Sequence, residues 1–175
     1  MKKILLLSDT HGHLDEKIIE YVVKADEVWH AGDLGNEKIL DKLSTHKPVK
    51  AVYGNIDGQL VRSQAPEFLS FTEEGLKVLI THIGGSPGRY VARAKTLIQK
   101  HLPNLFICGH SHILKVMHDQ HHKHLHLNPG AAGISGFHKI RTMLRFTLDK
   151  GKINQLEAIE LGLRGALTNA INGTN

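Results

Sequence analysis

The sequence contains one cysteine, Cys108, and no long run of apolar residues. A single thiol excludes a disulfide within the chain and is typical of a protein from a reducing compartment. The longest apolar run is far shorter than the ~20 residues that a membrane-spanning helix needs. The basic start, residues 1–3, is followed by only four apolar residues and no small-residue cleavage site, so we expect no signal peptide. We therefore expect a cytoplasmic protein without a membrane segment.

Aromatic residues are also scarce, at 5% of the chain, and Lys and Arg are scattered without a dense basic block. Stacked aromatic side chains and clustered cations are the usual signals of a nucleic-acid binder, so the sequence disfavours that function. The net charge of +5 and the pI near 9.3 are compatible with an anionic substrate. The composition fits one globular domain, which we place at residues 1–164, followed by a flexible polar tail over 165–175.

Apolar patterning predicts three successive βα units at the start of the chain. The run 4–7 is apolar at every position, which is typical of a strand buried on both faces. Apolar residues at helical spacing between positions 18 and 23 predict an amphipathic helix. Asn36 is a suitable N-cap for a second helix over 37–43. Successive βα units favour a parallel sheet with crossover helices.

The rest of the chain is predicted to be mostly β. We also expect a helix over 90–101, opened by Pro87, and a tight turn at 128–130. The predicted strands are 4–7, 27–31, 49–53, 68–72, 76–80, 105–108, 114–118, 124–127, 142–148 and 153–159.

Five of the predicted strands end in residues that can bind a metal ion, and four of these strand ends carry a nearby glycine. Ligands in open α/β sheets bind outside the carboxyl ends of strands. Each residue alone could be an ordinary polar loop residue, but five at one topological position indicate a site. Asp, His and Asn together suit Mn, Fe, Zn or Co better than Ca. The candidates are Asp9, His11, Asp33, Asn55, His82, His110 and His112.

The ordered motifs Asp-x-His, Gly-Asp, Gly-Asn-x-Asp, His-x-Gly and Gly-His-Ser-His resemble those of the calcineurin-like metallophosphoesterases. The resemblance covers about residues 3–160. The short length and the 128–130 turn resemble the small prokaryotic phosphodiesterase subgroup. The fold that this implies is α/β (α+β): a four-layer αββα sandwich of two mixed β-sheets flanked by helices.

The resemblance also implies a ligand set for two divalent metals, with manganese expected and Fe, Zn, Ni or Co as alternatives. It implies hydrolysis of a small-molecule phosphoester, most often a diester, by a hydroxide that bridges the metals. Asp33, Asn55 and His82 would lie at the reaction centre with that hydroxide. The first metal would be held by Asp9, His11 and His112, the second by Asn55, His82 and His110, and Asp33 would bridge both.

The chain departs from the family pattern at two positions. Ile56 stands where many larger members have a histidine thought to bind phosphate or protonate the leaving group, and Ala131 stands where the subgroup usually has serine. Loss of a general acid should cost ~10²–10⁴-fold with poor leaving groups. We therefore expect a preference for activated aryl phosphodiesters, or a substitute donor. His138 and Arg141 could reach a substrate phosphate, but Arg141 is better interpreted as a surface charge.

Other polar residues have two interpretations. Asp57 could orient a neighbouring ligand or stabilise its turn, and the sequence does not choose between these. His13 could contact substrate, although an exposed position at a helix entry is favoured. The chain has fourteen histidines, and those in 118–126 could form a secondary metal site. We favour a hairpin there, with His121 and His122 in a solvated turn and His124 and His126 on one strand face. We interpret His30, His46 and His101 as structural or surface residues.

Two other functions compete with that of a phosphoesterase. A eukaryotic retromer subunit of this fold is regarded mainly as a protein-interaction module, so a metal-binding scaffold with little catalysis is the main alternative. The ligand set of that subunit is degraded, whereas all seven candidates are present here, which favours catalysis. A nuclease is disfavoured because relatives that act on DNA are usually longer. The sequence leaves open the natural substrate and whether the chain forms a homo-oligomer.

Overall fold

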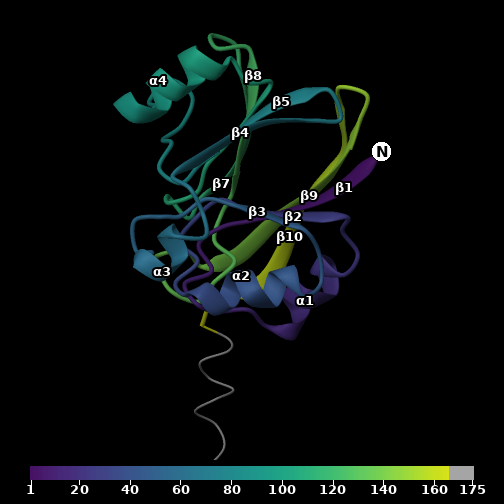
Figure 1. The fold of residues 1–175 in the computed structure, drawn as a ribbon, viewed down its shortest axis with the longest axis vertical. Helices are drawn as coiled ribbons and strands as arrows, with labels where there is room; N and C mark the ends of the chain where they lie inside the picture. Colours follow the sequence, from purple (N-terminus) through teal and green to yellow (C-terminus); the bar gives the residue numbers. More distant parts are fainter. Residues whose placement is uncertain (166–175) are drawn as a thin grey trace, which may run out of the picture.

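The computed structural model describes residues 1–165 as two five-stranded β-sheets packed face to face, with helices on both outer faces (Figure 1). The first sheet has the order β10 (Lys152–Leu163), β9 (Ile140–Asp149), β1 (Lys2–Leu7), β2 (Glu27–His30) and β3 (Val49–Ala51). The second has the order β4 (Phe68–Glu73), β5 (Leu76–Thr81), β6 (Leu105–Ile107), β8 (His124–Pro129) and β7 (Leu114–Asp119).

Both sheets are mixed. Strands β1, β2 and β3 run parallel, and β9 pairs antiparallel with β1. Strands β5, β6 and β8 run parallel between antiparallel β4 and β7. Helices α1 (Glu16–Val22) and α2 (Glu37–Ser44) cover the first sheet, and α4 (Ala92–His101) covers the second. The predicted four-layer αββα sandwich is confirmed.

Buried apolar side chains form three layers: one between the first sheet and its helices, one between the two sheets, and one between the second sheet and α4. Strand β1 contributes side chains to the first two. Leu5 and Leu7 pack against the helices on the first sheet, whereas Ile4 and Leu6 pack between the sheets. All four are at most 1% exposed. Burying an aliphatic side chain of this size contributes about 1.5–3 kcal/mol. The fully apolar run therefore forms a strand buried on both faces, as predicted, and holds the loop that follows it firmly in place.

The helix predicted over 90–101 begins instead at Ala92. Tyr90 is buried against Phe106, with ring centroids 5.3 Å apart, so its position is set by packing rather than by the helix. The Val91 amide donates to Gly84 O at 3.2 Å and closes the preceding loop, which contains Pro87. Pro87 therefore lies in this loop and does not open the helix. A short helix, α3 (Gln59–Arg62), was not predicted.

The histidine-rich tract forms the β7–β8 hairpin, as favoured. His124 and His126 are both buried, and the Tyr90 hydroxyl lies 2.9 Å from His124 Nε2 and 3.4 Å from His126 Nδ1. Burial lowers the pKa of each of these two histidines to about 4. His122 is only half-buried rather than solvated, because its Nδ1 lies 2.9 Å from Asp119 Oδ2. Within residues 1–165, the tract is not among the groups of closely spaced metal-binding side chains.

The end of the predicted domain lies close to the end of β10. The Arg164 amide donates to Lys139 O at 2.9 Å, just beyond the last strand residue, Leu163. The division into 1–164 and a tail stays a prediction, and residues 166–175 lie outside the described residues. None of the helices in the described part is both long and apolar enough to cross a membrane.

Candidate metal centre

The seven candidate ligands follow the carboxyl ends of β1, β2, β3, β5 and β6. Parallel pairing within each sheet brings these ends to one edge of the sandwich. Six of the seven side chains form two groups of three, and within each group the ligand atoms lie within 4.8 Å of one another. The groups are Asp9, His11 and His112, and Asp33, His82 and His110.

Asp33, a member of the second group, also faces the first, so that one carboxylate oxygen lies toward the other members of each group. Its Oδ2 is 3.7 Å from His11 Nε2 in the first group, and its Oδ1 is 3.3 Å from His82 Nε2 in the second. Asn55, the seventh candidate, places its Oδ1 3.1 Å from His82 Nε2. A carboxylate in this position can bind two cations at once, as in sites with two metals ~3.5–4 Å apart.

Two buried polar atoms of the first group have no hydrogen-bond partner. These are Asp9 Oδ1 and His11 Nε2. Asp9 Oδ1 lies 3.1 Å from His112 Nε2, but without hydrogen-bond geometry. Leaving such atoms unpaired costs about 1–3 kcal/mol each, unless a cation uses their lone pairs. The residues present therefore fit a divalent metal ion at this position.

The electrostatic environment also favours a cation. Burial alone would lower the pKa of His82, but the carboxylates of Asp33 and Asp9 raise it above its ordinary value. Burial alone would raise the pKa of Asp33, but hydrogen bonding and charge from His82 lower it. Two carboxylates, 0% and 2% exposed, thus create a strong negative potential that bound cations would neutralise.

The backbone at this edge is strained. Five candidate ligands have left-handed backbone angles, with φ of 54° at Asp9, 49° at His11, 56° at Asp33, 67° at His110 and 57° at His112. This region is uncommon for residues other than glycine, and such strain clusters at functional sites. These turns lie in the loops after β1, β2 and β6 and bring candidate ligands together, a feature that the sequence pattern did not reveal.

Two glycines allow the loops to approach closely. A Cβ atom on Gly54 would overlap the Asp33 carboxylate, and one on Gly109 would overlap Ser8 Oγ. Only glycine therefore fits beside these side chains. The glycines noted in the motifs before Asn55 and His110 thus have a steric role in bringing the ligands together.

Two of the candidate histidines are oriented by contacts of the ring nitrogen that faces away from the site. His82 Nδ1 donates to Ala31 O at 2.8 Å, which turns its Nε2 toward Asp33. His112 Nδ1 lies 3.1 Å from His138 Nδ1, and His138 Nε2 donates to Gly133 O at 3.0 Å. Such contacts fix which nitrogen can bind a metal. His138 therefore contacts a candidate ligand and lies close to the site.

Three further residues brace the loops that carry the ligands. Asp57 accepts hydrogen bonds from the amides of Leu34, Gly35 and Gly54. It therefore stabilises its own turn, and it also ties the loop after β3 to the loop after β2. His30 is fully buried, accepts from the Gly32 amide and lies 2.9 Å from Thr10 Oγ1, which agrees with a structural role. Burial lowers its pKa to about 4.

The third brace is Asn128, whose role was missed in the sequence. Its Nδ2 donates to Gly109 O at 2.9 Å and to Ser111 Oγ at 3.1 Å, so it holds the loop that carries His110 and His112. In the structure Asn128 lies in β8, next to β6, and not in the turn predicted at 128–130; that predicted turn was the only signal in the sequence.

The interpretation of Arg141 as a surface charge is wrong. Arg141 is 2% exposed, and its Nη2 lies 2.8 Å from Asp15 Oδ2. Its Nε donates to Ala132 O at 2.8 Å. Burial alone would raise the pKa of Asp15, but the Ile18 amide and Arg141 lower it. The local sequence does not reveal this burial, because Asp15, the counter-charge of Arg141, lies far away in the sequence. His13, half-buried at the entry to α1, places its Nε2 3.3 Å from the same carboxylate.

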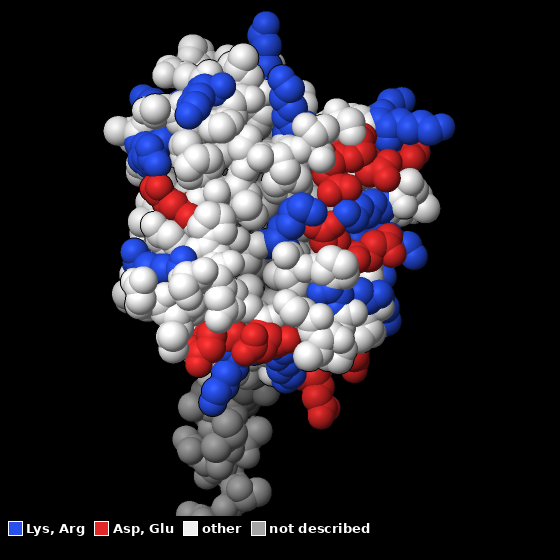
Figure 2. Space-filling view, in the orientation of Figure 1, with Lys and Arg blue, Asp and Glu red and all other residues white. Residues whose placement is uncertain are grey.

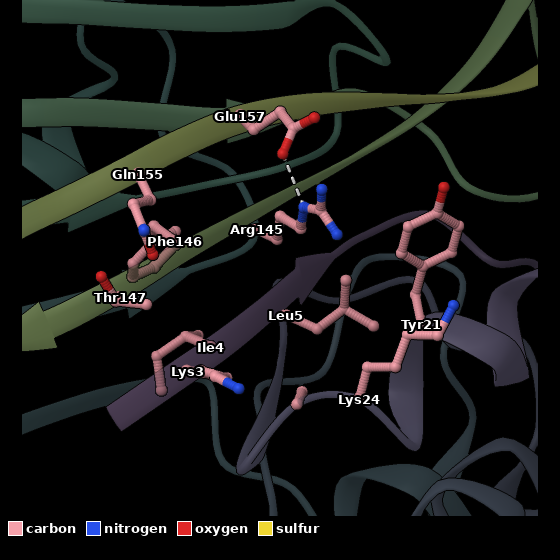
Figure 3. Close-up of a pocket in the computed structure, with 11 residues that line it drawn as sticks. Lys3, Ile4, Leu5, Tyr21, Lys24, Arg145, Phe146, Thr147, Gln155 and Glu157 are labelled. Carbon is pink, nitrogen blue, oxygen red and sulfur yellow. Dashed lines mark hydrogen bonds and ion pairs between the residues drawn. The ribbon is translucent and has the colours of Figure 1, made fainter. Parts of the chain in front are cut away.

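A cavity of about 580 Å³ lies toward the start of β1, away from the candidate ligands (Figure 3). Its lining includes Lys3, Leu5, Tyr21 and the ion pair of Arg145 with Glu157. None of the candidate ligands lines it. The chemistry suggested by the ligand set therefore belongs to the strand ends and not to this cavity.

Residues 1–151 match the family model of the calcineurin-like phosphoesterase superfamily domain. The chain belongs to this superfamily. A probable metallophosphoesterase of Mycoplasma pneumoniae is 30% identical over 167 residues, which cover 89% of this chain and 96% of the relative. Membership supports a metal-dependent phosphoester hydrolase, and the family predicted from the motifs is confirmed.

Solved structures share the fold. That of an archaeal phosphodiesterase is 25% identical with a TM-score of 0.71, and the match covers 91% of this chain and 99% of that one. Vps29 of Entamoeba histolytica in complex with Zn²⁺ is 17% identical with a TM-score of 0.67, covering 90% and 98%. At that identity the likeness to Vps29 shows the fold alone.

Proposed function

We propose that this superfamily member is a two-metal phosphodiesterase that hydrolyses a small-molecule phosphoester. The observation that carries the proposal is the position of Asp33 between two groups of converging ligand atoms. The first group holds the three residues that the family pattern gives to one metal, and the second holds His82 and His110 together with Asp33, with Asn55 beside His82, which supports this assignment. Manganese is the proposed metal on the family resemblance, and the mixed N/O donor set suits Mn, Fe, Zn and Co alike.

When bound, the two cations would neutralise the charge of the phosphate. They would also lower the pKa of a water molecule to near neutrality, so that hydroxide is available. The chain supplies the geometry for this chemistry. Asp33 is fixed by the Ile56 amide, which donates to its Oδ1 at 3.0 Å. His82 is fixed by Ala31 O, and the Asp9 carboxylate accepts from the His110 amide at 3.2 Å. These contacts position the ligands before any substrate binds, which lowers the cost of reorganisation.

The Ile56 side chain favours a substrate with a good leaving group. It is 46% exposed next to Asn55 and cannot donate a proton. A leaving group that departs as a stable anion does not need an acid, whereas an alkoxide does. We therefore propose that activated aryl phosphodiesters are hydrolysed faster than unactivated alkyl esters.

A panel of phosphoesters tests the proposed function. The chelated protein is reloaded with Mn²⁺, Fe²⁺, Zn²⁺, Ni²⁺ or Co²⁺, and kcat/KM is measured for bis-p-nitrophenyl phosphate and p-nitrophenyl phosphate. We expect metal-dependent hydrolysis, with the diester preferred. The variant His46→Ala is the control, because His46 is exposed and outside the metal centre. Faster turnover of the monoester would count against a diesterase.

A metal-binding scaffold with little catalysis is the alternative function, since a likeness in fold such as that to Vps29 does not by itself imply catalysis. The scaffold would bind metal with a similar affinity but hydrolyse neither ester with any of the five metals. A nucleic-acid substrate has less support. On the face shown in Figure 2, basic side chains intermingle with acidic ones on the right and stand apart elsewhere, and they form no continuous basic stripe.

A further inference from the structure

A pocket of about 350 Å³ opens beside the second group of candidate ligands. Asn55 and His82 form part of its wall. A phosphoester whose phosphorus lies at the metal centre would therefore extend an organic group into this pocket. The volume is near the lower limit of ordinary ligand sites, so the pocket fits one ring-sized group rather than an oligomer.

Ile83 and Val91 provide apolar surface in the pocket. They are 40% and 37% exposed, which leaves branched aliphatic side chains open beside a polar centre. The Val91 amide donates to Gly84 O at 3.2 Å, so both residues are held at the two ends of one closed loop. Apolar surface held in place beside a ligand site favours an apolar group.

Arg62 provides a fixed positive charge in the same pocket. Its guanidinium carbon lies 4.4 Å from the centre of the Tyr53 ring. Nε donates to Asp57 O at 2.7 Å, and Nη2 donates to Gly54 O at 3.5 Å. These carbonyls are neutral, and the arginine ion pairs within residues 1–165 involve Arg93, Arg141 and Arg145 but not Arg62. Its charge is therefore uncompensated by a carboxylate.

The other charged side chains of the lining cancel each other. Arg93 Nε and Nη2 donate to the two carboxylate oxygens of Glu67, at 3.1 and 2.8 Å. This bidentate pair contributes polar groups without net charge. The pocket thus combines aliphatic surface with a stacked Tyr53–Arg62 pair, and the Arg62 guanidinium of that pair carries the charge that no carboxylate compensates. A guanidinium fixed in this way can stack on a flat ring or donate to its acceptors.

We propose that this pocket selects phosphoesters whose organic group is a flat aromatic or heteroaromatic ring. An aryl ester and a nucleotide share this chemistry. The inference rests on the proposed function, because the phosphate must lie at the metal centre for the ring to enter the pocket. It goes further by naming Arg62, Ile83 and Val91 as the residues that determine specificity.

The first test uses competitive inhibition, so that leaving-group chemistry plays no part. Phenylphosphonate is compared with methylphosphonate, and adenosine 5′-monophosphate with ribose 5-phosphate, against hydrolysis of bis-p-nitrophenyl phosphate. We expect the ring to lower Ki at least ~10-fold in one or both pairs. The pair that shows the effect identifies the aryl or the nucleoside source. Equal Ki values within both pairs would overturn the inference.

The matched variants are Arg62→Met and Arg145→Met. Arg62→Met should raise Ki for the ring-bearing inhibitor about fivefold or more and leave Ki for its ring-free partner unchanged. Arg145 lines the cavity at the other end of β1, so Arg145→Met should change neither value. A uniform change for both inhibitors in Arg62→Met would show that Arg62 is not a specificity residue.

A binding measurement separates this inference from the proposed function. In zinc-loaded protein with labelled methyl groups, phenylphosphonate should shift the NMR signals of Ile83 and Val91. The signal of Val116, which is exposed on β7 outside the pocket, should not move. If no ester is hydrolysed but these shifts occur, the catalytic proposal fails and the pocket stands. If hydrolysis occurs and these two signals do not shift, the pocket assignment is wrong.

Discussion

The Nδ1 atoms of His112 and His138 lie 3.1 Å apart and connect the loop after β6 to the segment before β9. His138 Nε2 donates to Gly133 O, so its Nδ1 carries a lone pair and accepts the Nδ1 proton of His112. This arrangement leaves the Nε2 lone pair of His112 free on the side of Asp9, 3.1 Å from its Oδ1. His138 is therefore a positioning residue for the first group of ligands.

Replacing His138 by Phe is expected to weaken metal binding at the first group by ~10–100-fold, the usual cost of losing a partner behind a metal ligand. Binding at the second group should be unchanged. Calorimetric titration of the chelated protein with Mn²⁺ resolves the two affinities. His138→Asn, which can supply an acceptor oxygen, should recover part of the loss, and His46→Phe serves as the exposed control. Identical titrations for His138→Phe and wild type would remove His138 from this role.

The Arg141–Asp15 pair is expected to stabilise the fold. Asp15→Asn should lower the free energy of unfolding by about 3 kcal/mol, because it leaves the buried guanidinium without a counter-charge. Asparagine is as good an N-cap as aspartate, so the cap of α1 on the Ile18 amide should persist. Urea unfolding of the metal-free protein measures the loss. In a cycle with Arg141→Met, the double variant should lose less than the sum of the single variants, and strict additivity would mean that the pair does not interact.

The buried histidines predict a loss of stability in mild acid. The pKa values of His124 and His126 fall from 6.5 to about 4 on folding because the side chains are buried. Between pH 6.5 and 4 the unfolded chain therefore binds more protons than the folded one, so stability falls as the pH falls. Above pH 6.5 the histidines are neutral in both states, and the full free energy of unfolding is retained. Acidification below pH 4 lowers that free energy by at most about 3 kcal/mol for each histidine.

Urea unfolding at a series of pH values, with chelator present, measures this dependence. The double variant His124→Gln, His126→Gln should show a shallower decline between pH 6.5 and 4. Part of the slope should persist, because burial also lowers the pKa of His30 to about 4. A double variant with the same slope as wild type would show that these two histidines are not the titrating groups.

Much of the fold could be predicted because it depends on local patterns. The uninterrupted apolar run in β1 and the glycine-flanked strand ends are visible in the sequence, and they located the edge at which the candidate ligands converge. The start of α4 could not be predicted, because packing of Tyr90 against Phe106 decides it. The burial of Arg141 depends on Asp15, from a distant segment. The left-handed backbone of five candidate ligands likewise results from tertiary contacts that no local pattern encodes.

The position of Asp33 between the two groups is the central claim, and metal counting tests it most directly. Metal content of Mn²⁺-loaded protein is measured after desalting for wild type, His11→Ala and Asp33→Ala. A bridging carboxylate predicts about two tightly bound ions in wild type, about one in His11→Ala and fewer than about one in Asp33→Ala. Circular dichroism of each variant confirms that the fold is intact. Retention of two tightly bound ions by Asp33→Ala would contradict the account.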